Sequence, residues 1–551
     1  MISRFSRRLV SAGALLLGAA AASVACSNGS DLSDTQKPCS GAQCAPDAGA
    51  DAPAEGSTAD SAAPDAPPAC VPTSQNDEPD DAYHDANCDG VDGDASAAVF
   101  LAPDGNDSAA GTIDAPVKTF AEALKRAASD KKDVYACIGT YTENVVLGAS
   151  HSARVFGGYD CKNDWRRGEQ HALVAPVSGL PLYLEAANDL SMEQVDFRAQ
   201  AASLPSDSSV AAVIKASLGV TFRRGVFTAG NGADGKSGSV GTAFAGPAPG
   251  GQDGAAAPET CSKSAPSGDC LMQAAGGGVG AVPHTCASGS IGTTGGKGGS
   301  GGNVMLNAAP QDGGFGLPIG GNGGKVNGVS TGLAGKAGAS GTHGSPGGDF
   351  GVFVDGKYDA TNAGTDGSFG ANGLAGGGGA GGKSAWGCPD VFSCYFRGGG
   401  GGQGGFGGCG GPGGTAGGGG GGSFAMVLIN SPVALKEVTL RSGNGGNGGP
   451  GAAGALGQTG GAHGKGGVAT SGHAGFDGGD GGDGGPGGIG GPGGGGPSFG
   501  IVYLGTPHSI DAVTFEVGVP GLGGAALSGP SAPPGLGGLS LEIDASGLPK
   551  N

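Results

Sequence analysis

The stretch that decides the fold is Ser423–Gly443, SFAMVLINSPVALKEVTLRSG, because it occurs three times in the chain. Ser498–Gly518 reads SFGIVYLGTPHSIDAVTFEVG with the same spacing, and Ser209–Gly230 reads SVAAVIKASLGVTFRRGVFTAG with one more residue. Each copy has an alternating apolar run, a corner, a second short β-prone run and a final glycine. One copy is too short to bury its apolar face, whereas stacked copies can bury it. We therefore predict that each copy is one coil of a parallel β-solenoid, with the three copies aligned along a common sheet.

The composition limits where a core can form and which partners fit. Of the 551 residues 127 are glycine, while 37% are apolar and 5% are aromatic, so a packed core is expected only in the repeated segments. The net charge is −19, and 18 acidic residues but only one basic residue, Lys37, lie between residues 26 and 114. This distribution argues against nucleic acid as a partner and favours a solvated acidic arm.

The N-terminus predicts export. Three arginines among the first eight residues precede an apolar run over Leu9–Val24, which is typical of a secretory signal and not of a membrane span. Ser23-Val24-Ala25-Cys26 resembles a lipobox, which implies that Cys26 is lipidated. The alternative is ordinary cleavage with Cys26 as a free thiol. The residue after the cysteine is Ser27, and a serine at this place resembles the pattern of Gram-negative lipoproteins that are sorted to the outer membrane.

The other twelve cysteines are an even number, and an exported chain favours disulfides. Zinc is the alternative, and the absence of any Cys-x-x-Cys pair argues against it. Local spacing suggests three disulfides, Cys39–Cys44, Cys70–Cys88 and Cys137–Cys161, and leaves two triplets, Cys261/Cys270/Cys286 and Cys388/Cys394/Cys409, to pair within and across.

A cluster of acidic residues near residue 90 predicts either a calcium site or a solvated turn. Asp85, Asn87 and Asp89 alternate, with Gly90 next and Asp92 shortly after. This spacing lets side-chain oxygens converge on one hard cation. It resembles EF-hand-like calcium loops and the Asp-x-Asn-Cys-Asp-Gly motifs of secreted bacterial proteins. It departs from the EF-hand pattern because a serine stands where the bidentate glutamate belongs. The alternative is an acidic turn fixed by a disulfide of Cys88.

The segment Val99–Trp165 carries a family resemblance. Thr119 and Glu122 form a capping box before an amphipathic helix that could cover an open sheet end, and GTYTEN at Gly139–Asn144 is the most specific part. The segment resembles pectin-lyase-like proteins of bacterial surfaces. The resemblance implies an all-β fold: a right-handed parallel β-helix, or solenoid, with an N-terminal capping helix.

Glycine recurs every third residue in two long insertions. Of the 18 positions 445, 448 and so on to 496, all are glycine except His463 and Ala469. Period three indicates extended chains of polyproline-II type with glycine along one edge. The insertions resemble glycine-rich PGRS-type surface proteins, which implies polyglycine-II-like bundles within one chain. Disorder and a collagen-like triple helix are the alternatives.

These features divide the chain into eight parts. The predicted parts are a signal peptide (1–25), a disordered acidic tether (26–79), an Asp/Asn-rich metal-binding turn (80–96), an N-terminal β-helix with its capping helix (97–230), a cysteine-containing glycine-rich insertion (231–422), one further β-helix segment (423–443), a period-three insertion (444–497) and the C-terminal β-helix with a tail (498–551).

Two classes of function remain. The first is a non-catalytic outer-membrane lipoprotein, a monomeric structural or adhesive scaffold anchored through its lipid, with extracellular polysaccharide as the candidate ligand and calcium as the only candidate cofactor. The alternative is a β-helix polysaccharide lyase or glycoside hydrolase. Its candidate catalytic residues are Asp189, Glu193, Asp196, Arg198, Arg223 and Arg224, but solvent-facing charges on neighbouring strands are the favoured interpretation of these residues.

Overall fold

The computed structural model describes residues 70–257, 275–279, 283–286, 293–303, 308–386, 395–470 and 472–550. The chain divides into two compact units, Met1–Ala69 and Cys70–Asn551, and only the second is described. The predicted signal, Cys26, the Cys39–Cys44 pair and most of the tether lie outside the described residues. Within the described ranges, no helix has the length and apolarity to cross a membrane.

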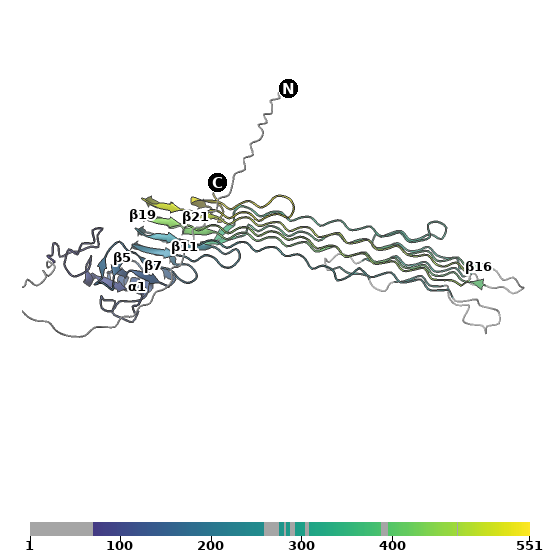
Figure 1. Ribbon diagram of the computed structural model, residues 1–551, viewed down its shortest axis with the longest axis horizontal. Coiled ribbons are helices and arrows are strands. Elements are labelled where there is room, and N and C mark those ends of the chain that lie inside the picture. Colours follow the sequence, from purple (N-terminus) through teal and green to yellow (C-terminus); the bar gives the residue numbers. More distant parts are fainter. Residues whose placement is uncertain are drawn as a thin grey trace, which may run out of the picture. The chain divides into compact units, whose positions relative to one another are not determined.

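Three mostly parallel sheets form the core of this unit (Figure 1). The first sheet has eight strands: β1 (Ala98–Leu101), β2 (Asp133–Cys137), β5 (Arg154–Asp160), β9 (Ser191–Glu193), β12 (Val220–Arg223), β19 (Val433–Lys436) and β22 (Ser509–Asp511), with β6 (Arg166–Arg167) antiparallel to β5. The second sheet has six: β3 (Gly139–Tyr141), β7 (Ala172–Val174), β10 (Val195–Arg198), β13 (Val226–Thr228), β20 (Thr439–Arg441) and β23 (Thr514–Glu516). The third has six: β4 (Val145–Leu147), β8 (Leu182–Glu185), β11 (Ser209–Lys215), β18 (Ser423–Ile429), β21 (Ser498–Leu504) and β24 (Gly537–Ile543).

The three copies of the repeat pair as their alignment predicts. Ser209 pairs with Ser423 and Ser423 with Ser498, all in the third sheet. Leu440 pairs with Phe515 in the second sheet, which is the predicted register. Each copy therefore contributes one strand to the third, first and second sheets in turn, and we call such a set of three strands a layer.

The predicted single all-β solenoid, a right-handed parallel β-helix over the whole chain, is wrong. The strands lie in three separate, mostly parallel sheets with an α-helix beside them, an α/β-like arrangement, and only 25% of the structure is strand. The physical reason lies in the glycine-rich segments. They lack the alternating apolar side chains that hold a strand in a sheet, so they leave the sheets and associate with one another.

Apolar side chains fill the space between the sheets. Phe197, Phe222 and Phe227 are almost fully buried and lie with ring centroids 5.0–6.4 Å apart. The outer face of the third sheet is covered as well, by the hairpin of β14 (Val352–Val354) and β15 (Lys357–Asp359). The ring centroid of Phe353 in this hairpin lies 5.0 Å from that of Phe424. Burial on both faces explains why β18, SFAMVLI, is a continuous buried run.

One helix, α1 (Phe120–Asp130), packs against β1, β2 and β4, in the earliest layers of the sheets. Thr119 caps it by accepting the N–H of Glu122, as the capping box predicts. Glu122 does not complete the box, because it pairs with Arg126 instead, and Asp107 accepts the N–H of Thr119. A short 3-10 helix, η1 (Ala95–Ala97), precedes β1.

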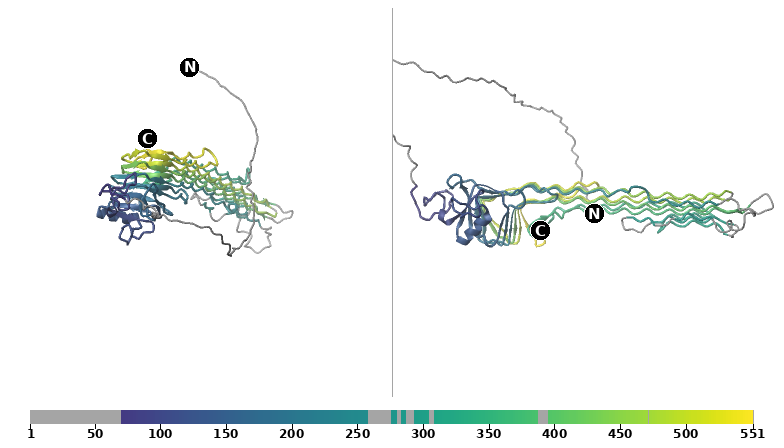
Figure 2. Two further views of the ribbon diagram at one scale, coloured as in Figure 1. Left: turned by 60° about the vertical axis from the view of Figure 1, so that its left-hand side comes forward. Right: turned by 90° about the horizontal axis from the view of Figure 1, so that it is seen from below.

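The glycine-rich segments run side by side in extended conformation (Figure 2). The N–H of Gly370 donates to the carbonyl of Gly411, the N–H of Gly411 to the carbonyl of Gly485, and the N–H of Gly485 to the carbonyl of Ala371. Each N–O distance is 2.8 Å. Segments far apart in sequence are thus joined through backbone hydrogen bonds. We call the described glycine-rich segments that follow β13, β20 and β23 the glycine bundle. A short hairpin of β16 (Ala385–Trp386) and β17 (Tyr395–Phe396) belongs to the same region.

Candidate functional site

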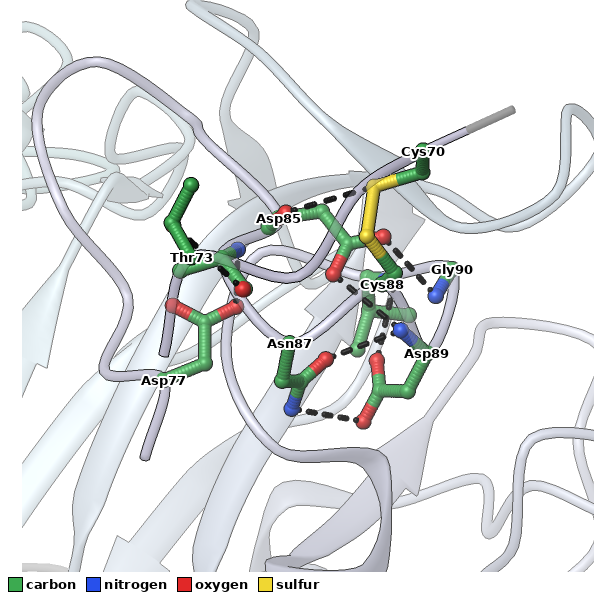
Figure 3. The surroundings of a disulfide bond; sticks show 10 residues. Cys70, Thr73, Asp77, Asp85, Asn87, Cys88, Asp89 and Gly90 are labelled. Carbon is green, nitrogen blue, oxygen red and sulfur yellow. Dashed lines mark hydrogen bonds between the residues drawn. A yellow bond between two sulfur atoms is a disulfide. The ribbon is translucent and has the colours of Figure 1, made fainter. Parts of the chain in front are cut away.

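The acidic loop, residues 70–97, is the first candidate, and a disulfide between Cys70 and Cys88 closes it (Figure 3). Asp85 accepts the N–H groups of Asp89 and Gly90 at 3.2 and 3.0 Å. Asn87 accepts the same N–H of Asp89 at 2.8 Å, and its amide donates to the Asp89 carboxylate at 3.1 Å. These predicted calcium ligands therefore cap backbone donors of their own loop.

The fourth predicted ligand, Asp92, points elsewhere. Its carboxylate lies 3.0 Å from the guanidinium of Arg167, and both side chains are almost completely buried. Among the described residues, Asp85, Asp89 and Asp92 do not form a group whose oxygens share one metal position. Calcium binding by Asp85, Asn87, Asp89 and Asp92 accordingly stays a prediction.

A residue that sequence reasoning missed holds the loop from inside. Asp77 is 7% exposed, and its carboxylate accepts the N–H groups of Ala86 and Gly93 at 3.0 and 3.1 Å. It fell within the predicted tether, whose composition gave no periodic signal. The ordered part of the loop therefore begins before residue 80, because a buried carboxylate organises it.

Arg167 is the centre of the second candidate, a buried ion cluster where the acidic loop meets the first sheet. Its guanidinium donates to Glu193 at 2.7 Å and to the side chain of Gln194 at 2.9 Å, in addition to Asp92. It also lies over the ring of Phe156 at 5.2 Å. Burial raises the pKa of Asp92 to about 6, against the hydrogen bond from Arg167. No sequence pattern singled out Arg167, because its partners are up to 87 residues away.

Three of the candidate catalytic residues meet in this cluster. Glu193 accepts from Arg224 and, at 3.1 Å, from Arg223, and both arginines also pair with Asp81 of the acidic loop. Burial opposes ionisation of Glu193, but hydrogen bonds from Arg224 and Arg167 hold its pKa below the usual value. The hydrogen bond from Arg223 lowers the pKa of Asp81. The arrangement neutralises charge and ties the loop to the sheets.

The other candidates lie apart from the cluster. Asp189 and Arg198 are exposed, and Asp189 has a left-handed backbone with φ of 50°. Asp196 lies 2.8 Å from His171 and accepts the N–H of Val226, also at 2.8 Å. The structure therefore brings together Glu193, Arg223 and Arg224, and does not bring Asp189 or Arg198 to them.

Disulfides occur at both predicted local pairs that the structure describes, Cys70–Cys88 and Cys137–Cys161. A third bond joins Cys286 to Cys409, one member from each predicted triplet. His284 lies 3.2 Å from the Cys409 sulfur and 2.8 Å from the side chain of Gln458. With both sulfurs in the disulfide, this group is a cross-link between segments of the glycine bundle.

A cavity of about 520 Å³ lies between the third sheet and the β14–β15 hairpin. Its walls include Tyr183, Val213 and the exposed Val177 and Leu204. Lys215, next to it, pairs with Asp355 of the hairpin at 2.7 Å and so ties the hairpin to the sheet.

Comparison with known proteins assigns no family. No family model matches the chain, and no curated protein matches it.

Proposed function

We propose that this chain is an exported, non-catalytic lipoprotein of the cell surface that acts as a structural or adhesive scaffold. The observation that carries the proposal is the glycine bundle, in which backbone groups bond with one another and glycine leaves no side chains at the contacts. An ideal Cβ at Gly411 would lie 2.1 Å from the carbonyl oxygen of Ala455, and one at Gly485 would lie 1.9 Å from that of Ala339. Such a body offers shape and stiffness and very little chemistry.

The candidate catalytic groups support the same proposal. Glu193, Arg223 and Arg224 are engaged with one another and with the acidic loop. An acid or base in a glycan-cleaving enzyme must be free to exchange a proton with its substrate. A carboxylate with a lowered pKa between arginines is a poor general acid.

Two further parts of the proposal, the lipid attachment site and the class of ligand, rest on the sequence. Cys26 is the residue that would carry the lipid, and the acidic segment after it would separate the folded unit from the membrane. Extracellular polysaccharide is the ligand class that we propose, because extended polymers suit long, regular surfaces.

Mass spectrometry of the mature N-terminus tests the location. We expect a diacylated Cys26 in the outer-membrane fraction and loss of membrane association in Cys26→Ala. A mature N-terminus that lacks both the cysteine and the lipid would overturn the proposal. A screen on polyuronates and other acidic glycans tests the absence of catalysis; turnover that is lost in Asp196→Asn or Arg223→Gln would overturn that part.

A further inference from the structure

The last layer of the sheets exposes residues that its predecessors bury. Phe222, Leu435 and Ile510 occupy one register position on β12, β19 and β22. Phe222 and Leu435 are each 1% exposed, whereas Ile510 is 55% exposed. Because β22 and β23 are the last strands of the first and second sheets, nothing in the described chain lies over this position.

The glycine bundle ends in the same way, and a second sequence change marks its end. Asn231 accepts the N–H of Asn444 at 2.8 Å, and Asn444 in turn accepts the N–H of Val519 at 2.9 Å. A parallel ladder runs from Asp234 to Asn447 and Leu522. Each ladder residue thus caps a backbone donor of the following segment.

The final members of both ladders are apolar. Val519 and Leu522 stand where the earlier segments have Asn or Asp, and each is 68% exposed. No further segment of the described chain needs a cap at these positions, but an end that faces water would favour polar residues. The apolar substitutions indicate that another surface covers this end.

We propose that the open end, formed by Ile510, Phe515, Val519, Leu522 and the edges of β22 and β23, is a docking surface for a second copy of this chain. The two copies meet open end to open end about a two-fold axis. This inference does not depend on the proposed function, and it replaces the monomer that the sequence suggested.

The opposite end favours this geometry over a filament. The helix α1 packs against β1 and β2. β1 is the other terminal strand of the first sheet, so an incoming copy meets a helix there. Head-to-tail addition is therefore blocked, and a closed pair is the simplest assembly left. A two-fold axis that runs across the stack and perpendicular to an edge strand sets that strand antiparallel to its copy, which permits hydrogen bonding between them.

Charge at the open end also suits a second copy. The chain has a net charge of −19, which would keep two copies apart if it were spread evenly. Two of the three acidic residues on the terminal strands are neutralised within the chain, since Glu516 pairs with Arg441 and Glu542 with Lys550, while Asp511 on β22 is exposed. These pairs reduce the local repulsion between two open ends.

Sedimentation equilibrium of the full exported chain tests the proposal, with Cys26→Ser in every sample so that acyl chains do not drive association. We expect a dimer. The double variant Val519→Asn/Leu522→Asn, which copies the residues of the preceding segment, should raise the dimer dissociation constant at least ~10-fold. Ile510→Asp should act in the same direction.

The control is Leu456→Asn, which changes an even more exposed apolar residue elsewhere in the glycine bundle. It should leave the dissociation constant unchanged, and circular dichroism should show that every variant keeps its fold. A wild-type chain that is monomeric up to about 100 μM, species larger than a dimer, or a double variant that dimerises as tightly as wild type would each overturn the proposal.

Discussion

At the scale of single residues, the buried charges are the most informative feature. Arg167 has a side chain with no exposed surface, and it is surrounded by Asp92, Glu193 and Gln194. Buried ions of this kind contribute little net stability compared with apolar groups, but removal of one partner leaves the others uncompensated. The cluster therefore makes attachment of the acidic loop sensitive to a single carboxylate.

Glu193→Gln should lower the free energy of unfolding by about 3 kcal/mol at neutral pH, because Arg167 and Arg224 lose their shared counter-charge. Chemical denaturation checks this value. Glu437→Gln is the matched control, since Glu437 is half exposed and 3.9 Å from Arg223, and it should change stability by less than about 0.5 kcal/mol. Equal effects of the two changes would contradict the assignment.

The same cluster predicts how stability depends on acid. Glu193 and Asp81 have pKa values below those of the unfolded chain, so their stabilisation is present above about pH 4.5 and is lost as the pH falls further. Asp92 has its pKa raised to about 6, so its ionisation lowers the stability of the fold as the pH rises from about 4 to 6. Below about pH 4, the free energy of unfolding of Glu193→Gln, measured by chemical denaturation, should therefore fall less steeply with decreasing pH than that of wild type.

Glycine at the contacts of the bundle is required by space. An added Cβ at Gly484 would lie 1.9 Å from the carbonyl oxygen of Cys409, whereas one at Gly246 would meet no atom within 4 Å. Gly484→Ala should cost about 1–3 kcal/mol, because backbone segments must move apart. Gly246→Ala should have little effect on the thermal midpoint, and similar losses in both variants would show that spacing is not the cause.

At the scale of elements, short strands and glycine segments are stabilised differently. The strands bury alternating side chains on one or both faces, as β18 does. The glycine segments have no such face and depend on hydrogen bonds such as that from Gly411 to Gly485. Both kinds of segment gain stability only from neighbours distant in sequence, so neither forms in isolation.

Hydrogen exchange checks the bundle at this scale. Amides of the described period-three segments 443–470 and 472–497 should exchange at least about a thousandfold more slowly than those of an unstructured peptide, because many donate to carbonyls of other segments. The exposed turn at 527–529 should exchange rapidly and serves as the internal reference. Fast exchange throughout 443–497 would contradict the bundle.

At the scale of the whole described unit, the chain passes repeatedly between sheets and bundle. It leaves the sheets after β13, β20 and β23 and returns at β18, β21 and β24. Each of these three layers is thus followed by a glycine segment, whereas the earlier layers are joined by short loops. The exposed Ile510 in the sheets and Val519 in the bundle belong to the last of these layers and the segment that follows it.

The sequence alone determined the local features of this protein. Repetition of SFAMVLI and its relatives indicated the register of β11, β18 and β21, because the copies align from their first serine. The capping residue Thr119 and the spacing of Cys70 and Cys88 were visible for the same reason, since their partners are close in the chain.

Only the tertiary structure decided the rest. The structure has three sheets and a separate bundle where the sequence predicted a single solenoid. The side chain of Asp92, predicted as a metal ligand, pairs with Arg167 instead. The structure also showed that Val519 and Leu522 end a ladder and face outward. These features depend on contacts between segments tens to hundreds of residues apart, and no local pattern of side chains encodes such contacts.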